Sequence, residues 1–164
     1  MRSGGRYLEG SFAALVSSFA LLMLVAVPGT VGAQASFSGT WELDRFKSVY
    51  EPVVTQPQRR VLSLDVKGED IVSRAQTWRG DAVNEVVITA KLDGKDHPVP
   101  NQPATVTFKR SNPTTIVRTA SIGGKLSETQ TWALSADGKV LTITSEGTDA
   151  QGTPIKSKQH YDRK

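Results

Sequence analysis

The chain has 164 residues, with 20 basic and 16 acidic side chains and a formal net charge of +4. This length predicts one domain, and the absence of cysteine excludes disulfides, thiol nucleophiles and thiolate metal sites. The basic residues are scattered over alternating positions and do not form a stripe with aromatic partners, so nucleic-acid binding is not expected.

The N-terminal region has the layout of a secretory signal peptide. Two arginines precede an apolar run over 19–27, a Pro-Gly pair ends the run, and small residues follow. This order predicts residues 1–35 to be a signal peptide, with cleavage after Ala33 or Ala35, and residues 36–164 to be the exported domain, in the periplasm or outside the cell. An uncleaved anchor is the alternative, but the apolar run is shorter than the roughly 20 residues of a spanning helix.

The rest of the sequence consists of short alternating runs of apolar and polar residues, separated by turn residues. The connection over 46–58 has two prolines and room for a short helical turn, and the one over 93–103 has three prolines. The alternating runs predict nine strands: 39–44, 59–66, 70–78, 84–92, 103–110, 114–122, 125–134, 139–146 and 153–162. Short turns between consecutive strands predict an all-β, single antiparallel up-and-down barrel of about nine or ten strands, since closure removes exposed edges.

Parity along the strands predicts which side chains face inward. In the first strand Phe37, Gly39, Trp41 and Leu43 share one face, which makes Trp41 inward. A bare Gly39 beside it permits a sharp bend or a close backbone approach. We therefore expect Trp41 to close one end of the barrel.

Two turns are informative about strand register. If Asp137-Gly138 is a two-residue turn, Leu134 lies with Leu141, and Trp132 lies opposite Ile143.

At Gly123-Gly124-Lys125 a two-residue turn would separate Ile122 from Leu126, whereas a three-residue loop brings them together. We favour the three-residue loop because the apolar ends then agree. It places the following residues on one face: Ile116, Arg118, Ala120, Glu128 and Gln130.

The Gly39-x-Trp41 pair on the first strand, soon after a signal-like segment, resembles the start of lipocalins and related calycin barrels. Three longer segments, 38–48, 91–99 and 134–155, are similar to a group of bacterial secreted lipocalin-like proteins of unassigned function. The resemblance implies a lipocalin-like barrel in which an arginine of the last strand covers the tryptophan. Parity makes Arg163 the candidate, with a cation–π contact worth about 0.5–2 kcal/mol.

The sequence contains few residues in patterns typical of catalysis or metal binding. His97 and His160 are not in a metal-ligand spacing, there is no nucleophile elbow or phosphate loop, and no metal or cofactor is predicted. An enzyme in the barrel mouth, with Glu128 or Asp96 as acid or base, is the least favoured function.

An inward polar set and an apolar wall favour a small-molecule cavity. The polar set is Arg74, Gln76, Arg118, Glu128, Gln130 and Gln159, and the apolar wall is Ile88, Phe108, Trp132 and Ile143. Unpaired polar groups are costly in a dry core, so these residues predict a partly wet cavity. The predicted function is an exported, non-catalytic binding protein for a small, partly apolar ligand, with Arg118 and Gln130 orienting an anionic or polar group.

Three alternatives remain open at this point. Arg118 and Glu128 could form an internal pair with water, or these faces could point to solvent. The protein could also be a structural or protein-interaction module with a filled core, which acts through the loop 93–103 or a sheet edge. The sequence predicts no partner beyond such a ligand, and no oligomeric state.

Overall fold

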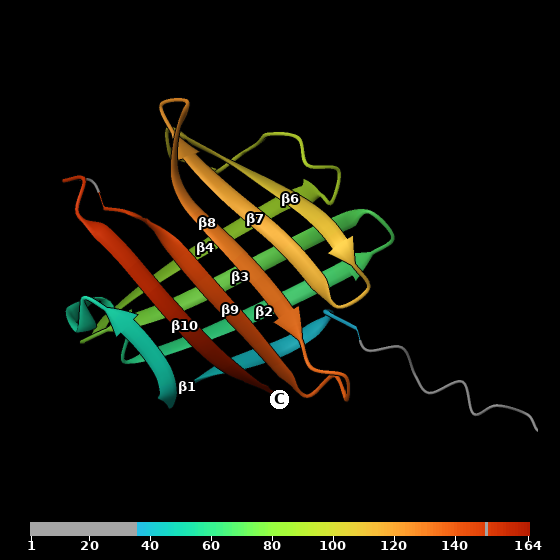
Figure 1. Ribbon diagram of the computed structural model, residues 1–164, viewed down its shortest axis with the longest axis horizontal. Helices are drawn as coiled ribbons and strands as arrows, with labels where there is room; N and C mark the ends of the chain where they lie inside the picture. The colour runs from blue at the N-terminus through green and yellow to red at the C-terminus, as the bar shows by residue number, and fades with distance from the viewer. Residues whose placement is uncertain (1–35, 150) are drawn as a thin grey trace, which may run out of the picture. The chain divides into compact units, whose positions relative to one another are not determined.

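The computed structural model describes residues 36–149 and 151–164 (Figure 1). The predicted signal peptide therefore lies outside the described residues. Within them, ten antiparallel strands form one sheet in the order β4-β3-β2-β1-β10-β9-β8-β7-β6-β5. The strands are β1 (Gly39–Glu51), β2 (Arg59–Lys67), β3 (Asp70–Arg79), β4 (Ala82–Lys91), β5 (His97–Pro98), β6 (Ala104–Asn112), β7 (Thr115–Ile122), β8 (Lys125–Leu134), β9 (Val140–Thr148) and β10 (Pro154–Arg163).

Strands that follow one another in the sequence pair with each other, except β4 and β5, which no ladder joins among the described residues. In addition, β1 pairs with β10. The sheet curls until β4 contacts β5 and β6 (Figure 1). The predicted all-β, up-and-down barrel is confirmed as a nearly closed one. No helix in the described part of the chain combines the length and hydrophobicity needed to cross a membrane.

The strand boundaries follow the predicted ones closely, with two additions in the proline-containing connections. The two-residue strand β5 lies in the second connection, and the first holds the expected helical turn, η1 (Val53–Thr55). β1 continues to Glu51, beyond the predicted end at 44, because its pairing with β10 shifts register between Asp44 and Val49. The Asp44 carboxylate accepts the backbone N–H groups of two residues at this irregularity. The strand bends there and then resumes its ladder.

The Trp41 side chain is fully buried in the core of the barrel, and its closure of one end stays a prediction. Its Nε1 donates to the Phe37 carbonyl at 3.0 Å. The Arg163 guanidinium lies 4.1 Å from the centre of the Trp41 ring and donates to the carbonyls of Ser36, Ser38 and Gly138. Gly39 has φ +143°, and a Cβ there would collide with that guanidinium. Position 39, two residues before Trp41, is therefore a glycine because the Arg163 guanidinium occupies the place of a side chain there.

The β7–β8 hairpin differs from the prediction in where its extra residue lies. Ile122 pairs with Lys125 across a two-residue Gly123-Gly124 turn with φ values of 56° and 77°, so the expected three-residue loop is wrong. The register shifts between Ala120 and Ser121, where Ser127 is the extra residue of a bulge on β8, so that Ala120 pairs with Glu128, as the predicted face requires. Both apolar hairpin ends remain exposed.

Gly147 on β9 makes room for this bulge. It pairs with Glu128, and a Cβ at Gly147 would collide with the Ser127 carbonyl and approach the Glu128 Cα to 2.9 Å. The backbone of the bulged strand thus occupies the space that any side chain at 147 would need.

Gly147→Ala is expected to lower the free energy of unfolding by about 1–3 kcal/mol, because overpacking forces the bulge to shift. Urea denaturation monitored by circular dichroism would measure this loss. Gly124→Asn is the control, since that glycine faces open space and asparagine tolerates a positive φ. Equal stability of Gly147→Ala and the wild type would contradict the close approach.

β8 and β9 pair in the predicted register, but the turn that joins them lies elsewhere than predicted. Leu134 pairs with Leu141 and Trp132 with Ile143, as expected. Gly138 donates its N–H to the Ser135 carbonyl and has φ +68°, so the turn is centred on Ala136-Asp137, one residue earlier than expected.

Candidate ligand cavity

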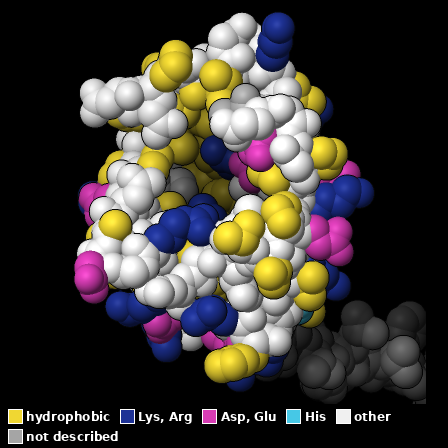
Figure 2. Space-filling model, turned by 90° about the vertical axis from the view of Figure 1, so that its left-hand side faces the viewer, with side chains coloured by type: hydrophobic (Ala, Val, Ile, Leu, Met, Phe, Trp, Pro, Cys, Tyr) yellow, Lys and Arg dark blue, Asp and Glu magenta, His cyan; other side chains and the backbone are white. Residues whose placement is uncertain are grey.

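The barrel interior holds a cavity of about 520 Å³. Its walls come from strands on both sides of the barrel and from the connection before β6. One face of the domain is hollowed, with hydrophobic side chains visible at depth (Figure 2). The volume lies within the range of small-molecule sites, about 300–1,000 Å³.

The apolar part of the wall includes Leu62, Ile88, Trp132 and Ile143. Trp132 is held in place because its Nε1 donates to Gln130 Oε1 at 2.8 Å. Phe108 was predicted to line the cavity, and this is wrong. It is fully buried behind Trp132, edge-to-face with a centroid distance of 5.6 Å, because it belongs to the packed core.

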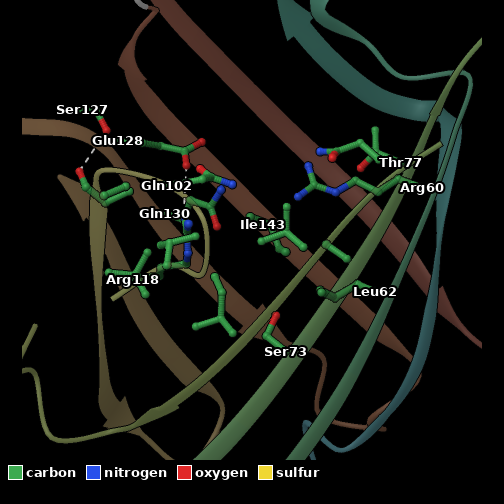
Figure 3. Close-up of a pocket in the computed structure, with 18 of the residues that line it drawn as sticks. Arg60, Leu62, Ser73, Thr77, Gln102, Arg118, Ser127, Glu128, Gln130 and Ile143 are labelled. Atoms are coloured by element: carbon green, nitrogen blue, oxygen red, sulfur yellow. Dashed lines mark hydrogen bonds and ion pairs between the residues drawn. The ribbon is translucent and has the colours of Figure 1, made fainter. Parts of the chain in front are cut away.

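Arg118 and Glu128 lie side by side on one wall (Figure 3). Arg118 donates to Glu128 Oε2 at 2.9 Å, and Ser145 donates to Glu128 Oε1 at 2.5 Å. Burial alone would raise the pKa of Glu128, but the Ser145 hydrogen bond and the Arg118 charge outweigh it and lower that pKa. Burial lowers the pKa of Arg118 against the opposing effect of Glu128. The internal pair left open above is therefore present, and it compensates the charge of Arg118.

Gln159 lines the cavity from β10 and also orders the core next to it. Its Oε1 accepts from the Tyr161 hydroxyl at 2.6 Å, and its Nε2 donates to Ser157 Oγ at 2.9 Å. Gln130 lines the cavity from β8, with β9 between it and Gln159. Each glutamine thus holds a buried aromatic residue of its own strand in place.

The predicted inward orientation of Arg74 and Gln76 is wrong. Both donate to Glu85, at 2.5 and 2.8 Å, on the outer surface of the barrel. The β2–β3 turn has two central residues, so Leu64 pairs with Ser73, and Ser73 shares the inward face of β3 with the fully buried Ile71. The β3 residues that line the cavity are Ser73, Ala75, Thr77 and Arg79.

Arg60 is the functional candidate that the sequence reasoning missed. Its side chain extends from β2 into the cavity, on the opposite wall from Arg118 and Glu128 (Figure 3). Its Nε is buried and has no hydrogen-bond partner among the described residues. A signal existed in the sequence, because Arg60 alternates in phase with the inward Leu62 and Leu64.

The geometry offers little for catalysis or metal binding. His97 contacts Asp93, with 3.2 Å between Nε2 and Oδ1, and Asp96 is not among the described residues that line the cavity. The lowered pKa of Glu128 favours the carboxylate, which already bonds Arg118 and Ser145. In residues 36–149 and 151–164, no group of three His, Cys, Asp or Glu side chains is arranged to hold a metal ion.

No protein-family model and no curated protein matches this sequence. Among solved structures, human cRBP IV has a TM-score of 0.53 at 14% identity and covers 79% of this chain and 99% of its own. As-p18, described as an extracellular fatty acid binding protein, has a TM-score of 0.52 at 11% identity, with coverages of 78% and 96%. A zebrafish ileal bile acid-binding protein complexed with cholic acid has 17% identity, coverages of 78% and 98%, and a TM-score of 0.47.

At these identities the first two likenesses bear on the fold alone. They agree with the calycin-type barrel that the sequence predicts, and the zebrafish structure is too dissimilar to add to the argument. The narrower resemblance to bacterial secreted lipocalin-like proteins stays a prediction.

Proposed function

We propose that this protein is an exported, non-catalytic binding protein that holds a small, partly apolar ligand in its barrel cavity. The observation that carries the proposal is the cavity of about 520 Å³. A barrel stabilised by core burial alone loses dispersion contacts along every unfilled stretch of its interior. An interior space of this size is therefore easier to understand as a binding site than as a packing defect.

The lining suits a molecule with one apolar and one polar part. Leu62, Ile88, Trp132 and Ile143 offer apolar surface, while the wall around Glu128 offers polar groups. As-p18 is described as binding fatty acid. Its likeness to this chain concerns the fold, so the cavity lining and not the likeness supports the choice of ligand.

The alternative is a protein-interaction module with a filled core that acts through the loop 93–103. One observation weighs against it, because Val99 of that loop is buried and faces the cavity. The loop thus contributes to the interior wall.

Native mass spectrometry of protein made from the full chain and isolated from a bacterial periplasm without denaturation tests this proposal. We expect a chain that begins at residue 34 or 36, with a discrete extra mass that disappears on unfolding. Ala75→Trp fills the cavity from β3 and should lose the extra mass, whereas Thr89→Trp on the exposed face of β4 should keep it. A folded protein that neither carries a ligand nor binds the neutral dye Nile red after extraction would contradict the binding function. An unprocessed chain would contradict export alone.

A further inference from the structure

The cavity contains an arginine that forms no ion pair with a described side chain and whose buried Nε has no hydrogen-bond partner among them. Three arginines line it in the described part of the chain, Arg60, Arg79 and Arg118, against one carboxylate, Glu128. Arg118 is paired with Glu128, and Arg79 is exposed at the rim, where it donates to the Thr55 carbonyl at 3.0 Å. Arg60 has neither an ion pair nor a side-chain hydrogen bond among residues 36–149 and 151–164.

A second buried donor without a partner among the described residues is the Tyr50 hydroxyl. Burial raises the pKa of Tyr50, and the charge of Arg60 acts in the opposite direction. The Tyr161 hydroxyl, by contrast, donates to Gln159. Tyr50 is not among the residues that line the cavity, so Arg60 is the one of these two that presents a donor without an acceptor to the cavity.

Such donors are costly to bury. An unpaired donor costs about as much as its lost hydration, and a buried charge costs more unless an opposite charge accompanies it. The protein could have avoided this cost with a neutral side chain at position 60, which has the same inward parity as Leu62. A guanidinium held this way is suited to a charge-assisted hydrogen bond with an anionic group.

We propose that Arg60 is the anion contact of the cavity and that the ligand is an amphipathic molecule with a single anionic head group of the carboxylate type. The head group accepts hydrogen bonds from Arg60. The apolar part lies along Leu62, Ile88, Trp132 and Ile143. This inference rests on the proposed binding function, and it moves the predicted anion contact from Arg118 to Arg60.

The opposite wall explains the orientation. Glu128 lies there with Arg118, and a second anion beside it would be repelled at close range. A singly charged ligand therefore places its head group toward β2, where the buried Nε of Arg60 has no partner in the described residues.

The test compares two ligands that differ only in the head group. Delipidated protein is titrated at neutral pH with dodecanoate and with dodecanol, each displacing the neutral dye Nile red. We expect the wild type to bind the acid at least about tenfold more tightly than the alcohol. Arg60→Gln should weaken dodecanoate about 10- to 100-fold and leave dodecanol within about threefold. Arg60→Lys, which keeps the charge, should retain part of the preference.

Arg59→Gln is the matched control, because it removes a neighbouring arginine from the outer surface of β2 and leaves the cavity lining unchanged. Equal affinity of the wild type for acid and alcohol would overturn the inference while leaving the binding function intact. So would an equal loss for both ligands in Arg60→Gln, or an acid preference that Arg59→Gln removes. Failure of Nile red and both ligands to bind the wild type would instead contradict the binding function. If Arg60→Gln does not fold, the wild-type comparison and Arg60→Lys still decide the question.

Discussion

Replacing Trp41 with alanine is expected to lower the free energy of unfolding by about 3–5 kcal/mol, the range for a fully buried tryptophan. The loss has three sources. The indole fills space in the barrel core, its Nε1 donates to the Phe37 carbonyl, and its ring supports the Arg163 guanidinium. Because domains of this size have about 5–15 kcal/mol of stability in total, the variant should be close to unfolding at physiological temperature.

Thermal unfolding followed by circular dichroism would measure this effect, with an expected fall in Tm of about 10–20 °C. Trp78→Ala is the matched control. That indole lies on the outer surface of β3, with the Arg59 guanidinium 4.7 Å from its ring centre, and its loss should cost much less. Similar losses for the two variants would refute the assignment of Trp41 as the residue that closes the barrel.

Glu128→Gln is expected to lower the free energy of unfolding by about 2–4 kcal/mol at neutral pH. The reason is that Arg118 then remains largely buried without a counter-charge, and the loss stays below the usual 3–5 kcal/mol because the cavity admits water. Glu85→Gln breaks the exposed pair with Arg74 and should cost about 0–1 kcal/mol.

The same variant should alter the response to acid. The folded-state pKa of Glu128 is lowered, so its carboxylate contributes stability that is fully present above the unfolded value of 4.5 and is lost as the pH falls through the folded value. Urea denaturation between pH 7 and pH 3 should therefore show a smaller loss of stability in Glu128→Gln than in the wild type. Parallel pH profiles would show that this pair does not contribute.

Several features of the fold are readable in the amino-acid sequence. Alternation with a period of two residues predicts strands and assigns their faces wherever one parity is clearly apolar, as in the first strand with Phe37 and Trp41. The turn residues mark where strands end, and the short turns require antiparallel neighbours. The inward Trp41 and the cavity-facing Arg118, Glu128 and Gln130 were accessible in this way, because each belongs to a strand with strong alternation.

Other features depended on what lies across the sheet. On β3 the apolar and polar residues are mixed on both parities, so only pairing with Leu64 decides that Ser73 faces inward and Arg74 outward. The bulge at Ser127 exists because Gly147 on another strand leaves space for it, and the sequence of the hairpin contains no sign of that. Phe108 and Trp132 both lie on the inward face of their strands. The three-dimensional packing places Phe108 in the core and Trp132 on the cavity wall.

The chain by itself thus determined the strands, the up-and-down order and the inward face of Trp41, because these depend on local periodicity and short turns. Only the tertiary structure decided which arginine forms an ion pair. Arg118 and Arg60 both have inward parity, but a carboxylate that pairs with either must come from another strand. Arg118 meets Glu128 because β7 and β8 are adjacent, whereas Arg60 forms no ion pair with any described side chain and its Nε has no hydrogen-bond partner among them. Charge compensation depends on distances between strands, which the order of residues along one strand does not contain.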